Sequence, residues 1–78
     1  MDKEISLKSG IVKSFSEERQ YGFISVDGGY VNAEGFQAKD IFFHESGMTY
    51  RVHKGDVVSF TIETGKKGLI AVNVKKNE

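Results

Sequence analysis

Short stretches in which apolar and polar residues alternate recur five times along the chain, and they limit the folds open to it. Alternation with a period of two places the apolar side chains on one face of a β-strand. Clusters of glycine and polar residues separate the stretches, and the sequence contains no proline. We expect strands at residues 5–15, 21–26, 40–44, 57–63 and 69–75. The pattern therefore predicts an all-β protein.

A chain of 78 residues has room for one small domain, and we assign residues 1–78 to a single domain. Five short antiparallel strands leave exposed sheet edges unless the sheet closes on itself. We therefore expect a small five-stranded antiparallel barrel. The alternation predicts the side chains that point into it: Ile24, Val26, Ile41, Phe43, Val58, Phe60, Ile62, Val72 and Val74.

Composition excludes several classes of protein. The chain lacks the apolar run of about 20 residues that a membrane span requires, and residues 1–4 do not begin a secretory signal, so we expect a cytoplasmic protein with no membrane partner. It has no cysteine and two histidines, so we expect no disulfide, no metal site and no cofactor. Because the formal net charge is zero, any surface that binds anions has to be local.

Four aromatic side chains fall on the outward face of two predicted strands. Tyr21 and Phe23 share the outward phase of one strand, and Phe42 and His44 share that of the next. If the two strands are neighbours, the rings form one exposed patch. Aromatic rings stack on nucleobases and cations bind phosphates, so the patch favours binding of single-stranded nucleic acid. The alternative is an outer hydrophobic layer, covered by residues 30–39 or by a partner subunit.

The order of the motifs resembles that of bacterial cold-shock proteins with a single domain. The resemblance covers residues 10–75 and depends on residues 10–13, 21–24, 39–44, 55–62 and 67–74. A G-F-I motif followed by an F-x-H motif and a V-S-F-T-I strand makes it specific. The resemblance implies a barrel of the oligonucleotide/oligosaccharide-binding (OB) type. It also implies that the protein binds single-stranded DNA and RNA as an RNA chaperone or as a modulator of transcription or translation.

The resemblance further implies which residues contact the nucleic acid. By their place in the motifs these are Lys13, Phe15, Arg19, Tyr21, Phe23, Phe42, His44 and Tyr50. The two cations are expected to bind phosphates, and the ring side chains to stack on bases. Ser14 stands where the family has an exposed tryptophan, and Glu45 where it has a third aromatic residue. Because stacking is worth about 1–3 kcal/mol per base, these two departures predict weaker binding unless other contacts compensate.

The connection between the second and third strands, residues 27–39, is longer than usual in the family. We expect residues 30–39 to form an extended loop, with Tyr30, Phe36 and Lys39 as accessory candidates for nucleic-acid contact. Either the loop folds toward the aromatic patch and replaces the lost rings, or its two aromatic residues only anchor it to the barrel. Leu69, in place of a proline usual in the family, is expected to affect only local strand geometry.

Three classes of function remain in competition. The leading hypothesis is a monomeric, non-catalytic protein that binds single-stranded DNA and RNA. The alternative is a barrel that has diverged to bind protein through the same face, including a strand-exchanged homodimer with residues 27–39 as the hinge. We expect no enzymatic activity and no catalytic residues. His44 and Glu45 are adjacent in the sequence and are expected to point to opposite faces of a strand, which is poor geometry for an acid–base pair.

Overall fold

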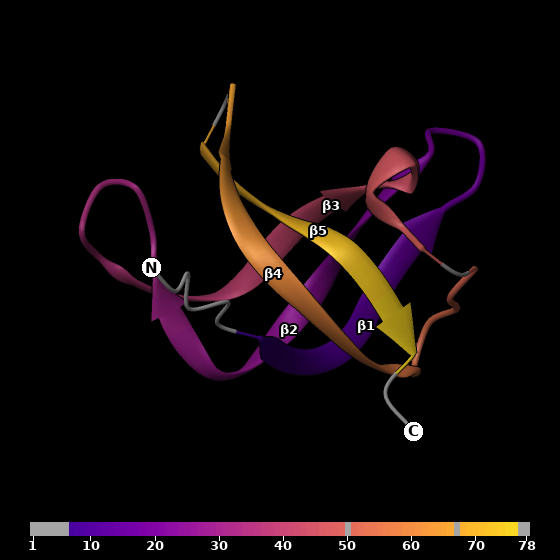
Figure 1. Cartoon of the computed structure of the whole chain (residues 1–78), viewed down its shortest axis with the longest axis horizontal. Coiled ribbons are helices and arrows are strands. Elements are labelled where there is room, and N and C mark those ends of the chain that lie inside the picture. Colours follow the sequence, from indigo (N-terminus) through magenta and orange to yellow (C-terminus); the bar gives the residue numbers. More distant parts are fainter. Residues whose placement is uncertain (1–6, 50, 67, 77–78) are drawn as a thin grey trace, which may run out of the picture.

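Five strands, in the order β1-β2-β3-β5-β4, surround the apolar core of the protein (Figure 1). This computed structural model describes residues 7–49, 51–66 and 68–76. The strands are β1 (Lys8–Ser16), β2 (Tyr21–Val31), β3 (Gln37–His44), β4 (Val57–Gly65) and β5 (Gly68–Lys76). The predicted closed barrel is confirmed, whereas residues 5 and 6 of the first predicted strand lie outside the described residues. The pairing of β3 with β5, which closes the barrel, is parallel, and the other pairings are antiparallel.

Apolar side chains from all five strands fill the barrel. Most of the predicted inward residues are buried, and three further residues join them, so that the core consists of Val12, Ile24, Val26, Ile41, Phe43, Val52, Val58, Phe60, Ala71 and Val74. The prediction for β5 is confirmed at Val74 but was wrong at Val72, which is only partly buried, because Ala71 takes the inward position. The backbone of Asn73 has a φ of 55°, and the β4–β5 register shifts opposite it, which breaks the strict alternation. Ile62, also predicted to point inward, packs against the core but is only partly buried.

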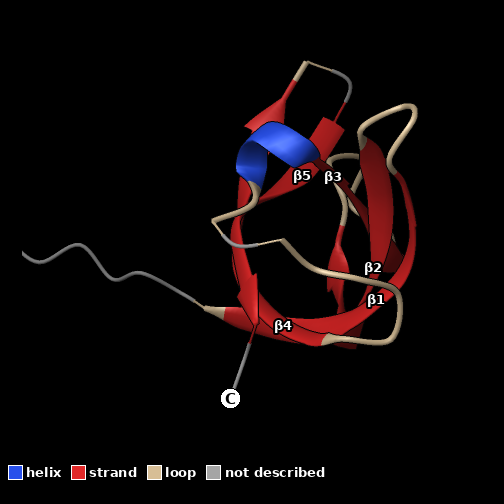
Figure 2. Cartoon of the chain, turned by 90° about the vertical axis from the view of Figure 1, so that its right-hand side faces the viewer, coloured by secondary structure: helices blue, strands red, loops and turns tan. Residues whose placement is uncertain are grey.

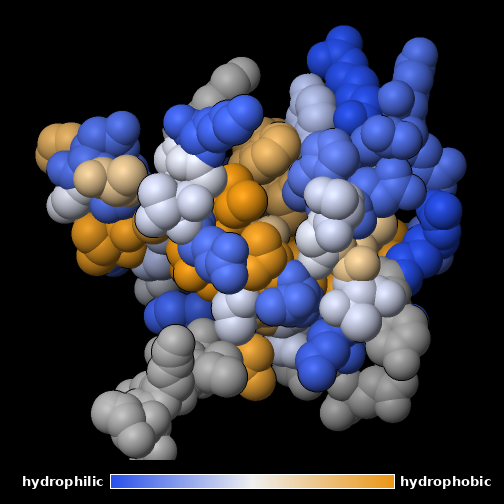
Figure 3. All heavy atoms as spheres, turned by 45° about the horizontal axis from the view of Figure 1, so that its top comes forward, coloured by the Kyte–Doolittle hydropathy of each residue, from blue (hydrophilic) through white to orange (hydrophobic). Residues whose placement is uncertain are grey.

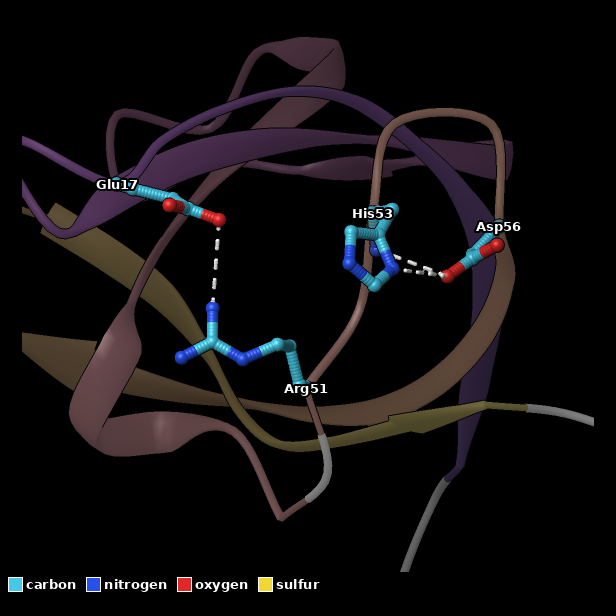
Figure 4. Close-up of polar contacts among 4 residues, drawn as sticks. All are labelled: Glu17, Arg51, His53 and Asp56. Atoms are coloured by element: carbon cyan, nitrogen blue, oxygen red, sulfur yellow. Dashed lines mark hydrogen bonds and ion pairs between the residues drawn. The ribbon is translucent and has the colours of Figure 1, made fainter.

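One open end of the barrel is covered by the 3-10 helix η1 (Glu45–Gly47) and by residues 51–56, as the view in Figure 2 shows. Val52 in this segment is fully buried and closes the core. Arg51 lies 3.4 Å from the carboxylate of Glu17 in the turn between β1 and β2, and the backbone N–H of His53 donates to Asp56 at 2.8 Å (Figure 4). The first contact joins the segment to the β1–β2 turn, and the second lies within the segment itself.

The β2–β3 hairpin continues beyond the barrel, at the left of Figure 1. The prediction of an extended loop over residues 30–39 was wrong at both ends, because Tyr30 pairs with Ala38 and Val31 pairs with Gln37, and only residues 32–36 lie between the strands. Between the barrel and this outer part the register shifts, and Gly28 and Gly29 there have positive φ values of 83° and 75°. We call residues 27–39 the arm. The two glycines interrupt the alternation, which explains why the sequence pattern did not reveal the strand ends.

Candidate nucleic-acid interface

Tyr21, Phe23, Phe42 and His44 lie together on the outer face of the barrel, as predicted, and we call them the aromatic platform. In the β2–β3 pair Tyr21 lies opposite His44 and Phe23 lies opposite Phe42. The ring centroids are 5.9 Å apart for Phe23 and Phe42, 5.3 Å for Tyr21 and Phe42, and 6.4 Å for Tyr21 and Phe23. These are contact distances for aromatic pairs, so the rings form one continuous surface.

The platform lines a groove of about 730 Å³, which we call the platform groove. Its other wall comes from the β4–β5 hairpin and consists of Gly65, Lys66, Leu69 and Ile70. Figure 3 shows hydrophobic side chains in the middle of the face that this hairpin borders, with hydrophilic side chains around them. The sequence reasoning missed this wall. Leu69 was expected to affect only local strand geometry, but its side chain also lines the groove. The missing information was the parallel pairing of Phe42 with Ile70, which no short-range pattern reveals.

His44 is held in a defined orientation by η1. Its Nδ1 accepts a hydrogen bond from the backbone N–H of Ser46 at 3.1 Å, and the hydroxyl of Ser46 lies 3.0 Å from the same nitrogen. Because Nδ1 is an acceptor, the neutral ring carries its proton on Nε2. The platform groove therefore has a hydrogen-bond donor beside its rings.

The predicted cations occupy different settings. Arg19 donates a hydrogen bond to the Tyr21 hydroxyl at 3.3 Å, which places its guanidinium at the edge of the platform and raises the pKa of Arg19. Lys13 donates to the carboxylate of Asp40 at 2.7 Å, and both side chains are exposed. Lys66, which the sequence reasoning did not select, lines the platform groove. Arg19 and Lys66 are thus two cations placed beside the platform.

Phe15 is not brought to the platform. Val12 pairs with Ile24 and Ser14 pairs with Phe23, so Lys13 is an extra, bulged residue in β1. The bulge reverses the alternation that follows it, and the ring of Phe15 stacks at 5.6 Å on Phe43, which is buried. Phe15 therefore packs on the core side of β1, and Ser14 takes the outward position next to Phe23.

None of the accessory candidates lines the platform groove. Tyr30 packs against the core, and its hydroxyl donates to the carbonyl oxygen of Asp40 at 2.8 Å. Burial, with a smaller effect from the Asp40 charge, raises the pKa of Tyr30. Phe36 lies at the tip of the arm with 69% of its surface exposed, and Lys39 lines a second groove near the base of the arm. Tyr50 lies outside the described residues.

Two further features are absent from residues 7–49, 51–66 and 68–76. That part of the chain contains no cluster of His, Asp or Glu side chains suited to a metal ion. It also contains no helix with the length and apolar character needed to cross a membrane.

Comparison with known proteins identifies the family. The 'Cold-shock' DNA-binding domain matches residues 8–77. The chain is 40% identical over 70 residues to the cold shock-like protein CspG of Shewanella violacea, covering 85% of this chain and 89% of that protein. It is 41% identical over 71 residues to the cold shock-like protein CspB of Escherichia coli, covering 85% of this chain and 87% of that protein.

The fold is also found in a solved structure. The structure described as drosophila Unr CSD456 superposes with a TM-score of 0.71 at 19% sequence identity. The match covers 95% of this chain and 28% of the other, so it concerns the fold alone. The family match, the two relatives and the barrel agree, and this chain belongs to the family of the cold-shock DNA-binding domain.

Proposed function

We propose that the chain binds single-stranded DNA or RNA by stacking bases on the aromatic platform. The observation that carries the proposal is the group of Tyr21, Phe23 and Phe42, whose rings contact one another on an outer face instead of packing in the core. A soluble domain rarely exposes several adjoining rings without a partner. Every nucleobase offers a flat π-face to such a surface, which makes the binding tolerant of sequence.

Hydrogen bonds and charges complete the proposed site. The Nε2–H of His44 donates to a base or a phosphate in the platform groove, and Arg19 and Lys66 bind phosphates at its edges. Because few cations border the groove, we expect about one to three counterions to be released on binding, and therefore a shallow dependence of affinity on salt. A slope steeper than about five in a plot of log affinity against log salt concentration would contradict this site.

The proposed biological role is that of an RNA chaperone or a modulator of transcription or translation in the cytoplasm, without catalysis. We propose that the protein acts as a monomer, since one barrel carries the whole platform. Light scattering at several concentrations tests this part. A mass that rises with concentration favours the alternative, in which the same face binds a second copy of the chain.

Two phenylalanines give a matched test of the platform. Phe23 on the platform and Phe36 at the tip of the arm are both exposed, so replacing either one by alanine removes a similar ring without emptying the core. Loss of one stacked base costs about 1–3 kcal/mol, so we expect Phe23→Ala to weaken binding of a labelled oligothymidine by about 5- to 150-fold.

Phe36→Ala is the control and should bind the same oligothymidine as the wild type does. Fluorescence anisotropy gives the dissociation constants, and circular dichroism shows that each variant is folded. If folded Phe23→Ala binds as tightly as Phe36→Ala, the platform is not the binding site.

A further inference from the structure

A second groove lies on the outer face of the same strand that carries half of the platform. Its volume is about 550 Å³, and its lining includes Ile11 of β1, Ser25 and Asp27 of β2, Lys39 of β3 and Val57 of β4. Nothing in the function proposed above uses this groove. Gly28 and Lys39 also line it, so the groove lies at the base of the arm, where the β2–β3 register shifts.

The two grooves adjoin along β2. Tyr21 and Phe23 line the platform groove, and Ser25 and Asp27 line the second groove. These four residues alternate along one strand and therefore share its outer face. Phe23 and Ser25 are separated by about 7 Å of strand. A chain lying on the platform along this strand therefore reaches the second groove without leaving the surface.

An ion pair marks the boundary between the grooves. Lys13 belongs to β1 and Asp40 to β3, the two neighbours of β2, and their charged atoms are 2.7 Å apart. Asp40 lies opposite Ser25 in the β2–β3 pair. The side chain of Lys13 is 59% exposed, so its ammonium group can contact the phosphate of a strand that passes from one groove to the other.

The lining of the second groove suits a base and its sugar. Ile11 and Val57 pair across β1 and β4, and each exposes about half of its surface (49% and 48%). A base or sugar that covers them removes apolar surface from water. Lys39 can bind a phosphate, and the carboxylate of Asp27 can accept a hydrogen bond from an amino group of a base. The charges of Lys39 and Asp27 cancel, so apolar contact with Ile11 and Val57, and not net charge, favours the binding of a nucleotide in this groove.

We propose that the second groove is a subsite for the continuation of the same single strand that lies on the platform. The inference depends on the proposed function, and it extends the binding site beyond the aromatic residues. In this proposal Ile11, Val57 and Lys39 contact the nucleotides that follow those on the platform. A short oligonucleotide that covers only the platform lacks these nucleotides.

The ratio of two dissociation constants tests the subsite. Oligothymidines of about 4 and about 12 nucleotides, both within the range of about 4–16 nucleotides bound by an OB fold, are titrated into each variant. Lys39→Ala removes the cation of the groove, and Val57→Thr replaces an exposed apolar group by a polar one of the same shape. Lys54→Ala is the control, since Lys54 is an exposed lysine that lines neither groove.

We expect the wild type and Lys54→Ala to bind the longer oligothymidine more tightly than the shorter one. In Lys39→Ala and in Val57→Thr the ratio of the two dissociation constants should fall by about 3- to 10-fold, as expected for about one lost contact. An unchanged preference in both variants overturns the subsite. So does an equal affinity of the wild type for both lengths, which would leave the groove to a protein partner. Failure of the wild type to bind either length overturns the proposed function itself, and the two failures are therefore distinguishable.

Discussion

Ser14 lies directly opposite Phe23 in the β1–β2 pair, on the outer face of the barrel. Across the strands this row continues through Phe42 to Ile70, and both of these residues line the platform groove. Only the β1 position of the row lacks a large side chain. The bulge at Lys13 turns Ser14 outward, so the backbone already offers a position for a ring there, and only the small serine side chain leaves it unfilled.

Ser14→Trp should therefore extend the platform by one ring. Because one more base can stack, we expect binding of an oligothymidine to tighten by about 1–3 kcal/mol, or about 5- to 150-fold. The quenching of the new tryptophan reports the binding directly. Ala33→Trp adds the same ring to the exposed tip of the arm and serves as the control. Equal affinities of the two variants would contradict the role of the row.

Asp40→Asn should free Lys13 for phosphate. The ion pair is exposed, and such pairs contribute about 0.2–1 kcal/mol to stability, so the variant should remain folded. The freed ammonium group adds about one phosphate contact, which should raise the affinity at low salt and steepen the salt dependence by about 0.7. Glu34→Gln makes the same change in net charge at the tip of the arm and is the control. The prediction fails if both variants show the same slope.

Period-two alternation was sufficient to predict the barrel and the platform, because each depends on neighbouring residues of one strand pointing to opposite faces. The pairing of Phe23 with Phe42 follows from two such patterns placed side by side. Alternation fails where the backbone departs from two residues per repeat. Because of the bulge at Lys13, the side chain of Phe15 points to the core. Near Asn73, whose φ is positive, Ala71 is buried and the predicted Val72 is not.

Contacts between distant strands were beyond the reach of the pattern. The wall formed by Leu69 and Ile70 depends on β5 meeting β3 in parallel, and this pairing joins residues that are far apart in the sequence. The arm was missed for a different reason. Gly28 and Gly29 interrupt the ladder, so the paired residues beyond them show no regular alternation with the barrel part of the strands.

Gly22→Ala should destabilise the barrel beneath the platform. Gly22 lies between Phe15 and Phe43 in the paired strands, and its lack of a side chain allows those two rings to stack. A methyl group there would overlap the Ser14 carbonyl oxygen and the Phe15 backbone. We expect a loss of about 1–3 kcal/mol in the free energy of unfolding, as overpacking typically costs, measured by urea denaturation.

Gly35→Ala is the control for the glycine substitution. Its backbone has a positive φ of 89°, but an added methyl group meets no atom within 4 Å. Only conformational strain of about 1 kcal/mol is expected there. A loss at Gly22 no larger than the loss at Gly35 would mean that the β1 backbone at Ser14 and Phe15 can move aside at little cost.

Tyr30→Phe should reveal how the arm is attached to the barrel. The substitution keeps the ring but removes the hydrogen bond from the hydroxyl to the Asp40 carbonyl, so we expect a loss of about 1 kcal/mol in the free energy of unfolding at neutral pH. Burial, and then the Asp40 charge, raise the pKa of Tyr30 above its ordinary value of 10.0. The folded state therefore favours the protonated phenol, and the resulting stability is complete below pH 10.0 and is lost as the pH rises through the pKa of the folded state.

Urea denaturation of the wild type and Tyr30→Phe, carried out below and above pH 10.0, measures both effects. Phenylalanine does not ionise, so the wild type should lose more stability than the variant over this range, and the difference between them should shrink. A difference that stays constant with pH would show that the hydroxyl of Tyr30 is not held against the barrel. In that case the base of the arm, and with it the wall of the second groove, would be less firmly placed than the hydrogen bond to Asp40 indicates.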